Sequence, residues 1–348
     1  MRKLAAARAP DTARPTIYDV ARRARVSTAT VSKVLRGIPT VGKENAGRVA
    51  EAVRALGYRR DPLAANLRSN RRAIVGLVVP DFKNPFFGSL VASIEKLAEA
   101  SGYRLVTVSS SESVDIECQQ IEALLDWRVA GLIVIPASTA LKDERRLRSV
   151  RLPAVILDRV PASTALDGVG VDDAAATGEM TRRFYLAGHR RLLVAASVPD
   201  LSNMKARIAG ITEVAATLSR EMEIEVLPCG ADLDSAMRAM ARRFDQSPRP
   251  TAVFALFIQA TLAALREIAR RGLTIPDDIS LAGFDDCEWM QLMHPPIATV
   301  IQPVEEMAER AWRQLLGRME NPDEVVRRFQ LPCQLDFRGS IGRLLPRD

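Results

Sequence analysis

Residues 16–35, TIYDVARRARVSTATVSKVL, contain two short amphipathic helical patterns separated by only a few residues. Thr16 followed by Asp19 is typical of a helix N-cap with an acidic residue in the first turn. In the first pattern the apolar residues recur three and four positions apart and so share one face: Ile17, Val20, Ala21 and Ala24. This spacing predicts a short helix that packs on one side against a neighbour.

The second pattern has Ser27 as a suitable N-cap and Gly37 as a stop. Its inward residues are expected to be Val31, Val34 and Leu35, and its outward residues Thr28, Ala29, Ser32 and Lys33. A third helix is predicted over residues 43–56, with these residues inward: Ala46, Val49, Val53 and Leu56. The sequence therefore predicts a small all-α domain, either a helix-turn-helix or a generic helical bundle.

Basic residues are concentrated at the start of the chain. Residues 1–72 contain 17 Lys/Arg and 5 Asp/Glu, a net charge of +12. Residues 73–348 contain 32 Lys/Arg and 37 Asp/Glu, a net charge of −5. Such a distribution favours a polyanion bound by the first segment, although a solvated basic tail would have the same composition. Combined with the helical patterns, it favours double-stranded DNA, because short side chains and one cation on the second helix suit the major groove.

These residues resemble the head of the lactose/galactose-repressor family of bacterial transcription regulators. The matching runs are residues 16–21 and 26–35, and the spacing from the first run to the second agrees with the family without interruption. The resemblance implies base-reading roles for Thr28, Ala29 and Lys33. It implies further DNA contacts, mostly to the backbone, for Thr16, Tyr18, Ser27, Thr30 and Ser32.

The chain departs from the family pattern in this region at three positions. Arg25 stands where the family usually has Gly in the turn, and Gly42 stands where it favours a Ser cap for the third helix, a loss of a few tenths of a kcal/mol. Gly47 lies inside that helix and costs roughly 1 kcal/mol relative to Ala. We therefore expect a less stable head with an intact base-reading face.

Residues 61–68, DPLAANLR, have a cap, a proline at the first helical position and barely two helical turns. A helix this short is marginal alone, so the segment is either a solvated linker or a helix that forms when something packs against it. In the family it is a hinge helix that folds on DNA, and Leu67 matches the leucine that enters the minor groove. The expected domains are a basic tail (1–15), a helix-turn-helix domain (16–60), a hinge (61–72) and an effector domain (73–348).

From Ile74 onward, apolar runs typical of strands alternate with amphipathic helical stretches. The strand-like runs are residues 74–79, 105–108, 131–135, 154–157, 192–195, 224–227, 252–255 and 279–282. The clearest helical stretches are residues 88–100 and 115–127. Repeated βα units predict an α/β domain of two lobes with parallel sheets, helices on both faces and a ligand cleft between the lobes.

This region also resembles the same family and the periplasmic sugar-binding proteins. The matching segments are residues 81–87, 158–159, 169–173, 186–191, 283–286 and 295–300. The resemblance implies that these residues contact the effector: Phe86, Phe87, Asp158, Asn203, Arg207, Phe257 and Asp285. Other interpretations remain open, since the two Phe residues are also expected in a core, Asp285 could end a strand and Arg207 could pair with a carboxylate on the lobe surface.

One departure concerns the effector itself. After residues 253–255 the family commonly has Asn-Asp, whose Asp faces ligand hydroxyls, whereas this chain has Phe257 and Ile258 followed by Gln259. A buried hydroxyl without a partner costs about 1–3 kcal/mol. A fully hydroxylated hexose should therefore bind poorly unless Gln259 or a water substitutes. Our hypothesis is an effector that is a sugar derivative or sugar acid with fewer hydroxyls facing Phe257, with a carboxylate or phosphate held by Arg207. The alternative is that Phe257 and Ile258 only pack the lobe.

Other classes of protein fit the composition poorly. The four cysteines are widely separated and only two histidines occur, so neither a disulfide framework, a metal site nor His-based catalysis is indicated. No enzyme motif, signal peptide or membrane span is recognisable. We expect a cytoplasmic regulator without cofactor or metal that acts as a homodimer on a near-palindromic operator, the usual arrangement in the family.

Overall fold

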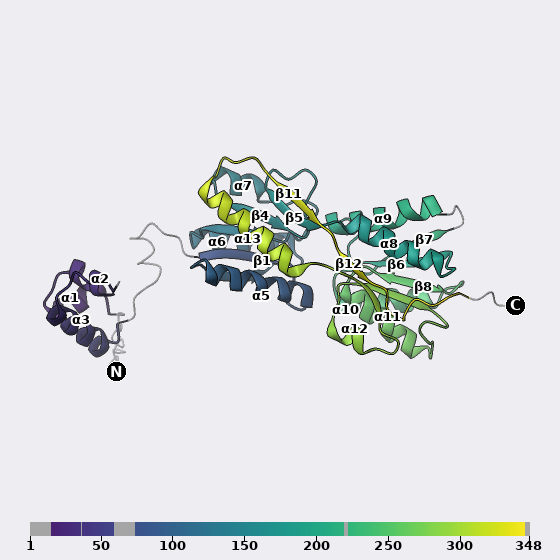
Figure 1. The fold of residues 1–348 in the computed structure, drawn as a ribbon, viewed down its shortest axis with the longest axis horizontal. Coiled ribbons are helices and arrows are strands. Elements are labelled where there is room, and N and C mark those ends of the chain that lie inside the picture. The colour runs from purple at the N-terminus through teal and green to yellow at the C-terminus, as the bar shows by residue number, and fades with distance from the viewer. Residues whose placement is uncertain (1–14, 36, 59–73, 219–221, 345–348) are drawn as a thin grey trace, which may run out of the picture. The chain divides into compact units, whose positions relative to one another are not determined.

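The computed structural model describes residues 15–35, 37–58, 74–218 and 222–344. Internal contacts divide the chain into two units, Met1–Arg71 and Arg72–Asp348. The first unit contains the three predicted helices α1 (Ile17–Ala24), α2 (Thr28–Leu35) and α3 (Lys43–Leu56), which Figure 1 shows in purple. The predicted hinge and Leu67 lie outside the described residues.

The three helices enclose a small core of their own. Its buried residues are Val20, Ala21, Ala24, Val31, Val49 and Ala52. All of these except Ala52 were predicted to point inward. The other predicted residues pack around them partly buried, except Ala46, which is half-buried but does not belong to this core. The helix-turn-helix expectation is confirmed, because α1 and α2 are joined by a short turn and both rest on α3.

The turn between α1 and α2 depends on a residue in the left-handed conformation. Arg25 has φ 52° and ψ 47°, and its N–H donates to carbonyls at the end of α1. This conformation favours glycine, so the substitution of arginine here carries a conformational cost. The Arg48 guanidinium of α3 donates to the Arg25 carbonyl at 3.4 Å and ties the turn to the third helix.

The second unit has two α/β lobes, each built on a six-stranded sheet. The first sheet has the order β11-β5-β4-β3-β1-β2 and is parallel throughout. Its strands are β1 (Ile74–Val79), β2 (Arg104–Ser109), β3 (Gly131–Val134), β4 (Ala154–Leu157), β5 (Asp167–Val171) and β11 (Arg328–Leu331). The helices of this lobe are α5 (Pro85–Ala100), α6 (Val114–Asp126), α7 (Glu144–Ser149) and α13 (Val304–Glu320).

The second sheet repeats this arrangement in the order β12-β10-β9-β8-β6-β7, with only β12 antiparallel to its neighbour. Its strands are β6 (Arg191–Ala196), β7 (Glu223–Pro228), β8 (Ala252–Ala255), β9 (Ser280–Phe284), β10 (Ala298–Ile301) and β12 (Gln334–Asp336). Its helices are α8 (Asp173–Leu186), α9 (Ser202–Leu218), α10 (Leu233–Phe244), α11 (Ile258–Arg270) and α12 (Glu288–Leu292).

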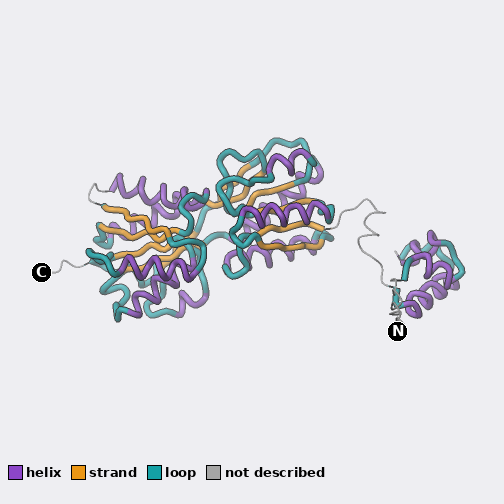
Figure 2. The backbone as a smooth tube through the Cα atoms, turned by 180° about the vertical axis from the view of Figure 1, so that it is seen from behind, coloured by secondary structure: helices purple, strands orange, loops and turns teal. Residues whose placement is uncertain are grey.

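Each sheet is covered on both faces, which explains why its central strands are apolar on both sides. In the first lobe α5 and α13 pack on one face, and α6 and α7 pack on the other. In the second lobe α8 and α9 face one core, and α10 and α11 face the other. Figure 2 shows the strands of each lobe enclosed between helices.

The chain passes between the lobes three times, at residues 171–173, 301–304 and 331–334. The prediction of two lobes with parallel sheets is therefore confirmed, but the sequence analysis did not predict strands β5, β10, β11 and β12. α5 begins at Pro85, three residues before the predicted start, because Asn84 caps it and proline fits the first turn. α6 also begins one residue early, at Val114.

Candidate functional site

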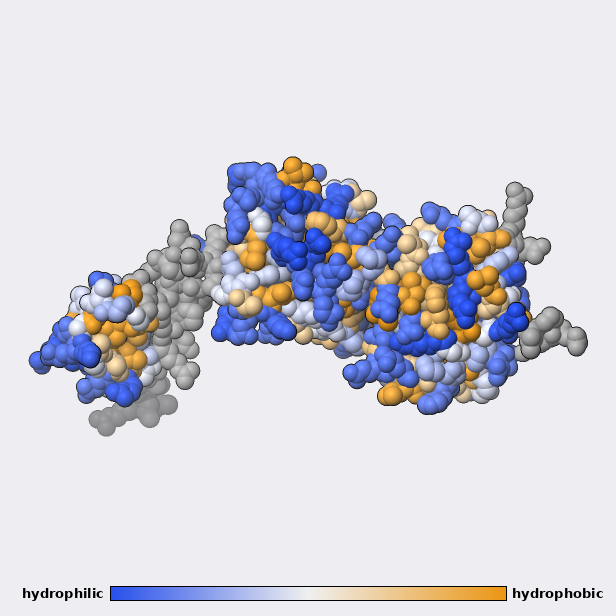
Figure 3. All heavy atoms as spheres, in the orientation of Figure 1, coloured by the Kyte–Doolittle hydropathy of each residue, from blue (hydrophilic) through white to orange (hydrophobic). Residues whose placement is uncertain are grey.

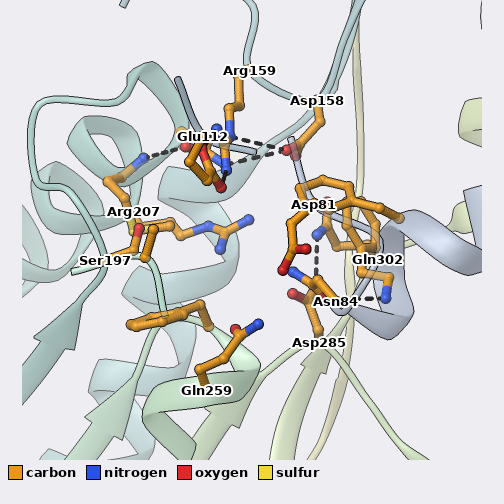
Figure 4. Close-up of a pocket in the computed structure, with 16 residues that line it drawn as sticks. Asp81, Asn84, Glu112, Asp158, Arg159, Ser197, Arg207, Gln259, Asp285 and Gln302 are labelled. Atoms are coloured by element: carbon orange, nitrogen blue, oxygen red, sulfur yellow. Dashed lines mark hydrogen bonds and ion pairs between the residues drawn. The ribbon is translucent and has the colours of Figure 1, made fainter. Parts of the chain in front are cut away.

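A cavity lies between the two lobes, at the carboxyl ends of the central strands. Its volume is about 460 Å³, including space that is open to solvent, and Figure 4 shows its polar lining. The lining residues are Asp81, Asn84, Phe86, Phe87, Glu112, Asp158, Arg159, Ser197, Asn203, Met204, Arg207, Ala231, Phe257, Gln259, Asp285 and Gln302. A cleft lined by few aromatic and many hydrogen-bonding groups is suited to a small polar molecule.

All seven residues predicted to contact the effector line this one cavity. They come from both lobes and from five places in the chain, so their meeting is a property of the fold. Three residues that were not predicted from the sequence line the cavity as well: Glu112, Ser197 and Gln302. Each of these three follows a strand (β2, β6 and β10), and that position was an available signal for Glu112 and Ser197, whereas the strand before Gln302 was not predicted.

Phe86 and Phe87 stand in the first turn of α5 and belong both to the cavity wall and to the core of the first lobe. Asn84 holds this turn by accepting a hydrogen bond from the Phe86 N–H at 3.1 Å. The ring centroids are 5.3 Å apart with a tilt of 56°. The core interpretation and the ligand interpretation are thus compatible, because one face of an aromatic side chain can pack while its edge borders the cavity.

Asp158 and Asp285 occupy matching places in the two lobes. Each follows a strand at the same position in its sheet, β4 and β9, and each has a positive φ, 62° and 72°. The N–H of each donates to the neighbouring strand, to the carbonyl of Val169 at 2.8 Å and of Val300 at 3.0 Å. The backbone therefore turns each carboxylate out of the sheet and into the cavity (Figure 4).

These two carboxylates are buried and have few donors. Asp158 accepts a long hydrogen bond from the Asn203 amide at 3.4 Å, and Asp285 accepts one from the Gln302 amide at 2.6 Å. Burial raises the pKa of Asp158 to about 7, because nearby Arg207 and Arg159 offset only part of the lost hydration. Burial likewise raises the pKa of Asp285.

Arg207 crosses from α9 into the cavity and is already engaged by its own lobe. Its Nε donates to Asp173 at 2.7 Å, with both side chains almost fully buried, and its Nη1 donates to the Leu256 carbonyl at 2.7 Å. The guanidinium carbon lies 3.4 Å from the centroid of the Phe284 ring. The alternative of a carboxylate partner for Arg207 is therefore realised, by a buried aspartate and not a surface one.

On the first lobe, Arg159 and Glu112 form a two-pronged ion pair at 2.7 and 2.8 Å. Arg159 also donates to the Pro136 carbonyl at 3.1 Å. Glu112 has φ 56° and follows Ser111 at φ 50°, so two successive non-glycine residues are left-handed. Such strain, roughly 1–3 kcal/mol per residue, persists only where the surroundings hold the backbone, here through the ion pair with Arg159.

Phe257 occupies the N-cap position of α11 and supplies no side-chain hydrogen bond to the helix. It is buried in the second-lobe core and also lines the cavity, whereas Ile258 is buried and does not. Gln259 lines the cavity beside it. The site is thus apolar at residue 257, as the sequence indicated, and the nearest polar side chain on α11 is an amide.

On the first unit, α2 presents Ala29 and Lys33 to solvent, while Val31 faces the core. Tyr18 is 68% exposed, and Thr28, Thr30 and Ser32 are half-buried. The Ser27 hydroxyl accepts from the Thr30 N–H at 3.2 Å and so caps α2. The outward face of α2 has the predicted residues, although neither their DNA contacts nor those of Tyr18 are thereby tested.

Thr16 has a local role besides the contact predicted for it. Its backbone N–H and hydroxyl both donate to the Asp19 carboxylate, at 3.0 and 2.7 Å. These hydrogen bonds lower the pKa of Asp19. Thr16 therefore fixes the start of α1, as expected for an N-cap.

Known proteins resemble both units. A model of bacterial regulatory proteins of the lacI family matches residues 16–61, and a periplasmic binding protein-like domain matches residues 181–341. The HTH-type transcriptional regulator PtxS of Pseudomonas putida is 30% identical over 332 residues, which is 94% of this chain and 96% of that protein. The chain belongs to the lacI family of bacterial regulatory proteins.

Solved structures of lacI-family and other transcription regulators are similar to this chain over nearly its whole length. A LacI-family regulator from Silicibacter pomeroyi has a TM-score of 0.79 at 25% identity and covers 94% of this chain and 100% of its own. The transcriptional regulator CelR in complex with cellobiose has a TM-score of 0.69 at 26% identity, covering 94% of this chain and 100% of its own. The relatives of this chain are transcription regulators, and its two units match a DNA-binding domain and a small-molecule effector domain. The chain is thus a DNA-binding transcription regulator with an effector domain.

Two further observations concern other possible sites in the regulator. Among the described residues, no group of His, Cys, Asp and Glu is arranged to hold a metal ion. In the same residues, no helix combines the length and apolar character needed to cross a membrane.

Proposed function

We propose that this regulator represses transcription as a homodimer bound to a near-palindromic operator, and that a sugar-type effector in the interlobe cavity controls its operator affinity. The observation that carries the proposal is the convergence of seven predicted residues from both lobes on one polar cavity. A ligand that touches both lobes there changes the energy of lobe closure, and so it can shift a two-state equilibrium.

The proposed DNA contacts come from α2. Lys33 and Ala29 are exposed, and short half-buried hydroxyl residues flank them, so the helix can approach base edges closely. One recognition helix of eight residues reads few bases, and two copies related by a twofold axis read a near-palindrome. The second unit has exposed apolar side chains, including Leu186, Leu292 and Val325, that could pack against a second copy of the chain. Figure 3 shows apolar patches on one face of this unit.

The proposed effector class follows from the chemistry of the cavity. Phe86 and Phe87 border it, and the buried carboxylates of Asp158 and Asp285 and the side-chain oxygen of Gln302 can accept hydrogen bonds from a ligand. A sugar presents C–H faces to aromatic rings and hydroxyl donors to carboxylates. The cellobiose complex of the related CelR supports the same class.

We also propose that the regulator is cytoplasmic and has no catalytic activity. His189 is buried between Thr251 and Ser280, at 3.2 and 2.9 Å, and burial lowers its pKa, so it is a neutral structural group. The acidic groups of the cavity face no activated nucleophile among the described residues, which supports a binding site.

The proposal is tested by a mobility shift on operator DNA selected from a random library, with random DNA as competitor. Affinity should fall by about 0.9 log units per log unit of salt for each phosphate contact. A thermal-shift screen with hexoses, polyols and sugar acids should find a ligand that adds about 2.7 kcal/mol of stability at 100 times its Kd. A monomer that binds an asymmetric site at full affinity, or binding indifferent to every ligand that stabilises the body, would contradict the proposal.

A further inference from the structure

The cavity contains two cations among its lining residues, and both are already paired within their own lobes. Arg159 is held by both oxygens of Glu112, at 2.7 and 2.8 Å. Arg207 is held by Asp173 at 2.7 Å, where both side chains are at least 95% buried. Each pair is close to electrically neutral, so neither arginine leaves the cavity with a net positive charge.

Two buried carboxylates have no cation within hydrogen-bond distance among the described residues. Asp158 and Asp285 are 5% and 7% exposed, and within the described part of the chain their carboxylates receive hydrogen bonds only from the side-chain amides of Asn203 and Gln302. The nearest cationic atom to Asp158 is the Arg159 Nε, at 3.9 Å from Oδ2. The cavity therefore contains more carboxyl groups than cations, and the half-buried Asp81 adds one more carboxyl group.

Two acceptor atoms of the cavity lining have no hydrogen-bond partner among the described residues, and the same is true of one donor atom, the Arg159 Nε. Asp158 Oδ1 is buried without a hydrogen bond, and so is Gln302 Oε1, on a residue 5% exposed. Buried acceptors of this kind are costly unless a ligand or water satisfies them. Because both atoms belong to residues that line the cavity, one on each lobe, a bound molecule that donates to both would bridge the lobes.

We propose that the effector is an amino sugar whose protonated nitrogen binds between Asp158 and Asp285. This inference rests on the proposed function and narrows its effector class. An ammonium group supplies three donors and the missing positive charge, so it suits a site with acceptors in excess. The sugar ring would border Phe86 and Phe87, and its side nearest Phe257 needs no hydroxyl.

The same contacts argue against a carboxylate at Arg207. An acid group there would lie among Asp158, Asp173 and Asp285, and the arginine charge is already shared with Asp173. Repulsion within a partly desolvated cavity is screened much less than at the surface. The site thus discriminates between an amine and an acid on the same sugar.

The raised pKa of Asp158 predicts that binding of an amine changes the number of bound protons, which a good steric fit alone would not do. Burial raises that pKa to about 7, so the group is mostly protonated at pH 6. A neighbouring ammonium favours the ionised form, and binding of an amine should therefore release protons at pH 6. A neutral sugar should release few protons, and an acid should release none, because it favours the protonated form that already predominates.

The test uses the full-length chain in titration calorimetry at pH 6, in buffers of different ionisation enthalpy. The probes are D-glucosamine, D-galactosamine and D-mannosamine, each beside its parent hexose and its N-acetyl derivative, with gluconate as the acid. We expect at least one hexosamine to bind ten times more tightly than its hexose and its N-acetyl form, with proton release. Asp158→Asn and, independently, Asp285→Asn should remove most of that preference.

Asp200→Asn is the matched control, since Asp200 is an exposed acid near the cleft whose partner is Lys205 at 3.2 Å. It should leave the preference intact. Tighter binding of a hexose or of gluconate would overturn the inference and leave the proposed function standing. Absence of any hexosamine binding at 10 mM would also overturn it. Failure of operator binding, measured separately by mobility shift, would refute the proposed function.

Discussion

Asp158→Asn should stabilise the empty body, and the gain should grow with pH. Asparagine keeps the acceptor for the Asn203 amide and tolerates the left-handed backbone at this position, φ 62°, better than most residues. The substitution therefore removes a charge with little change in shape. The carboxylate that it removes is difficult to ionise in the folded chain, because burial raises its pKa.

The magnitude follows from the raised pKa. Asp158 has a folded pKa of about 7 against an ordinary value of 3.8. Between these values the unfolded chain ionises first, so the folded state loses stability as pH rises, and the loss is complete above pH 7. Each pKa unit corresponds to about 1.4 kcal/mol, which makes the full loss about 4 kcal/mol, with about 2–3 kcal/mol of it between pH 5 and 8.

Urea unfolding followed by tryptophan fluorescence measures this effect on the body. All three tryptophans, Trp127, Trp289 and Trp312, lie in the second unit. The Asp158→Asn advantage over the wild type should rise from about 1–2 kcal/mol at pH 5 to about 4 kcal/mol at pH 8. Asp277→Asn, at an exposed loop position, should show no such trend. An advantage that is absent, or equal at both pH values, would refute the reasoning.

Four further substitutions test other parts of the regulator. Gly47→Ala should stabilise α3 by about 1 kcal/mol, seen as slower amide exchange, because a Cβ there meets nothing within 4 Å; faster exchange would contradict this. Gly210→Ala should destabilise the second lobe by roughly 1–3 kcal/mol in urea unfolding, since its Cβ would lie 2.1 Å from the Ala174 carbonyl oxygen; an unchanged midpoint would show that α8 and α9 can separate freely. Lys33→Ala should cost about 1–3 kcal/mol of operator affinity and relax one base position, whereas equal loss on all sequences would make Lys33 a phosphate contact. Leu67→Ala should weaken operator binding by a few kcal/mol with little effect on random DNA, and unchanged affinity would make the hinge a simple linker.

The helical head was the most predictable part of the regulator. Its inward residues follow helical spacing, and Val20, Val31 and Val49 are fully buried as expected. Most central strands were also predictable, because strands buried on both faces are continuous apolar runs. β5 was missed because its sequence, DGVGV, contains two glycines, and β12 because it has only three residues.

Several residues that line the cavity could be predicted from the sequence, but the ion pairs that they form could not. Family resemblance brought the seven predicted residues together, yet nothing in the sequence indicated that Asp173 pairs with Arg207 inside the lobe. That pairing depends on the packing of α8 against α9, which is a tertiary property. Gln302 escaped notice because β10 was not predicted, and Glu112 because its place depends on a strained turn.

The central claim is that occupancy of the interlobe cavity controls operator binding, and one measurement tests it most directly. Operator affinity of the full-length chain is measured by fluorescence anisotropy with and without the hexose or hexosamine that most raises its melting temperature. We predict at least a tenfold change in Kd for the wild type, and little change for Asp285→Asn at the same ligand concentration. An operator Kd that is unchanged by a ligand shown calorimetrically to bind the wild-type chain would contradict the account.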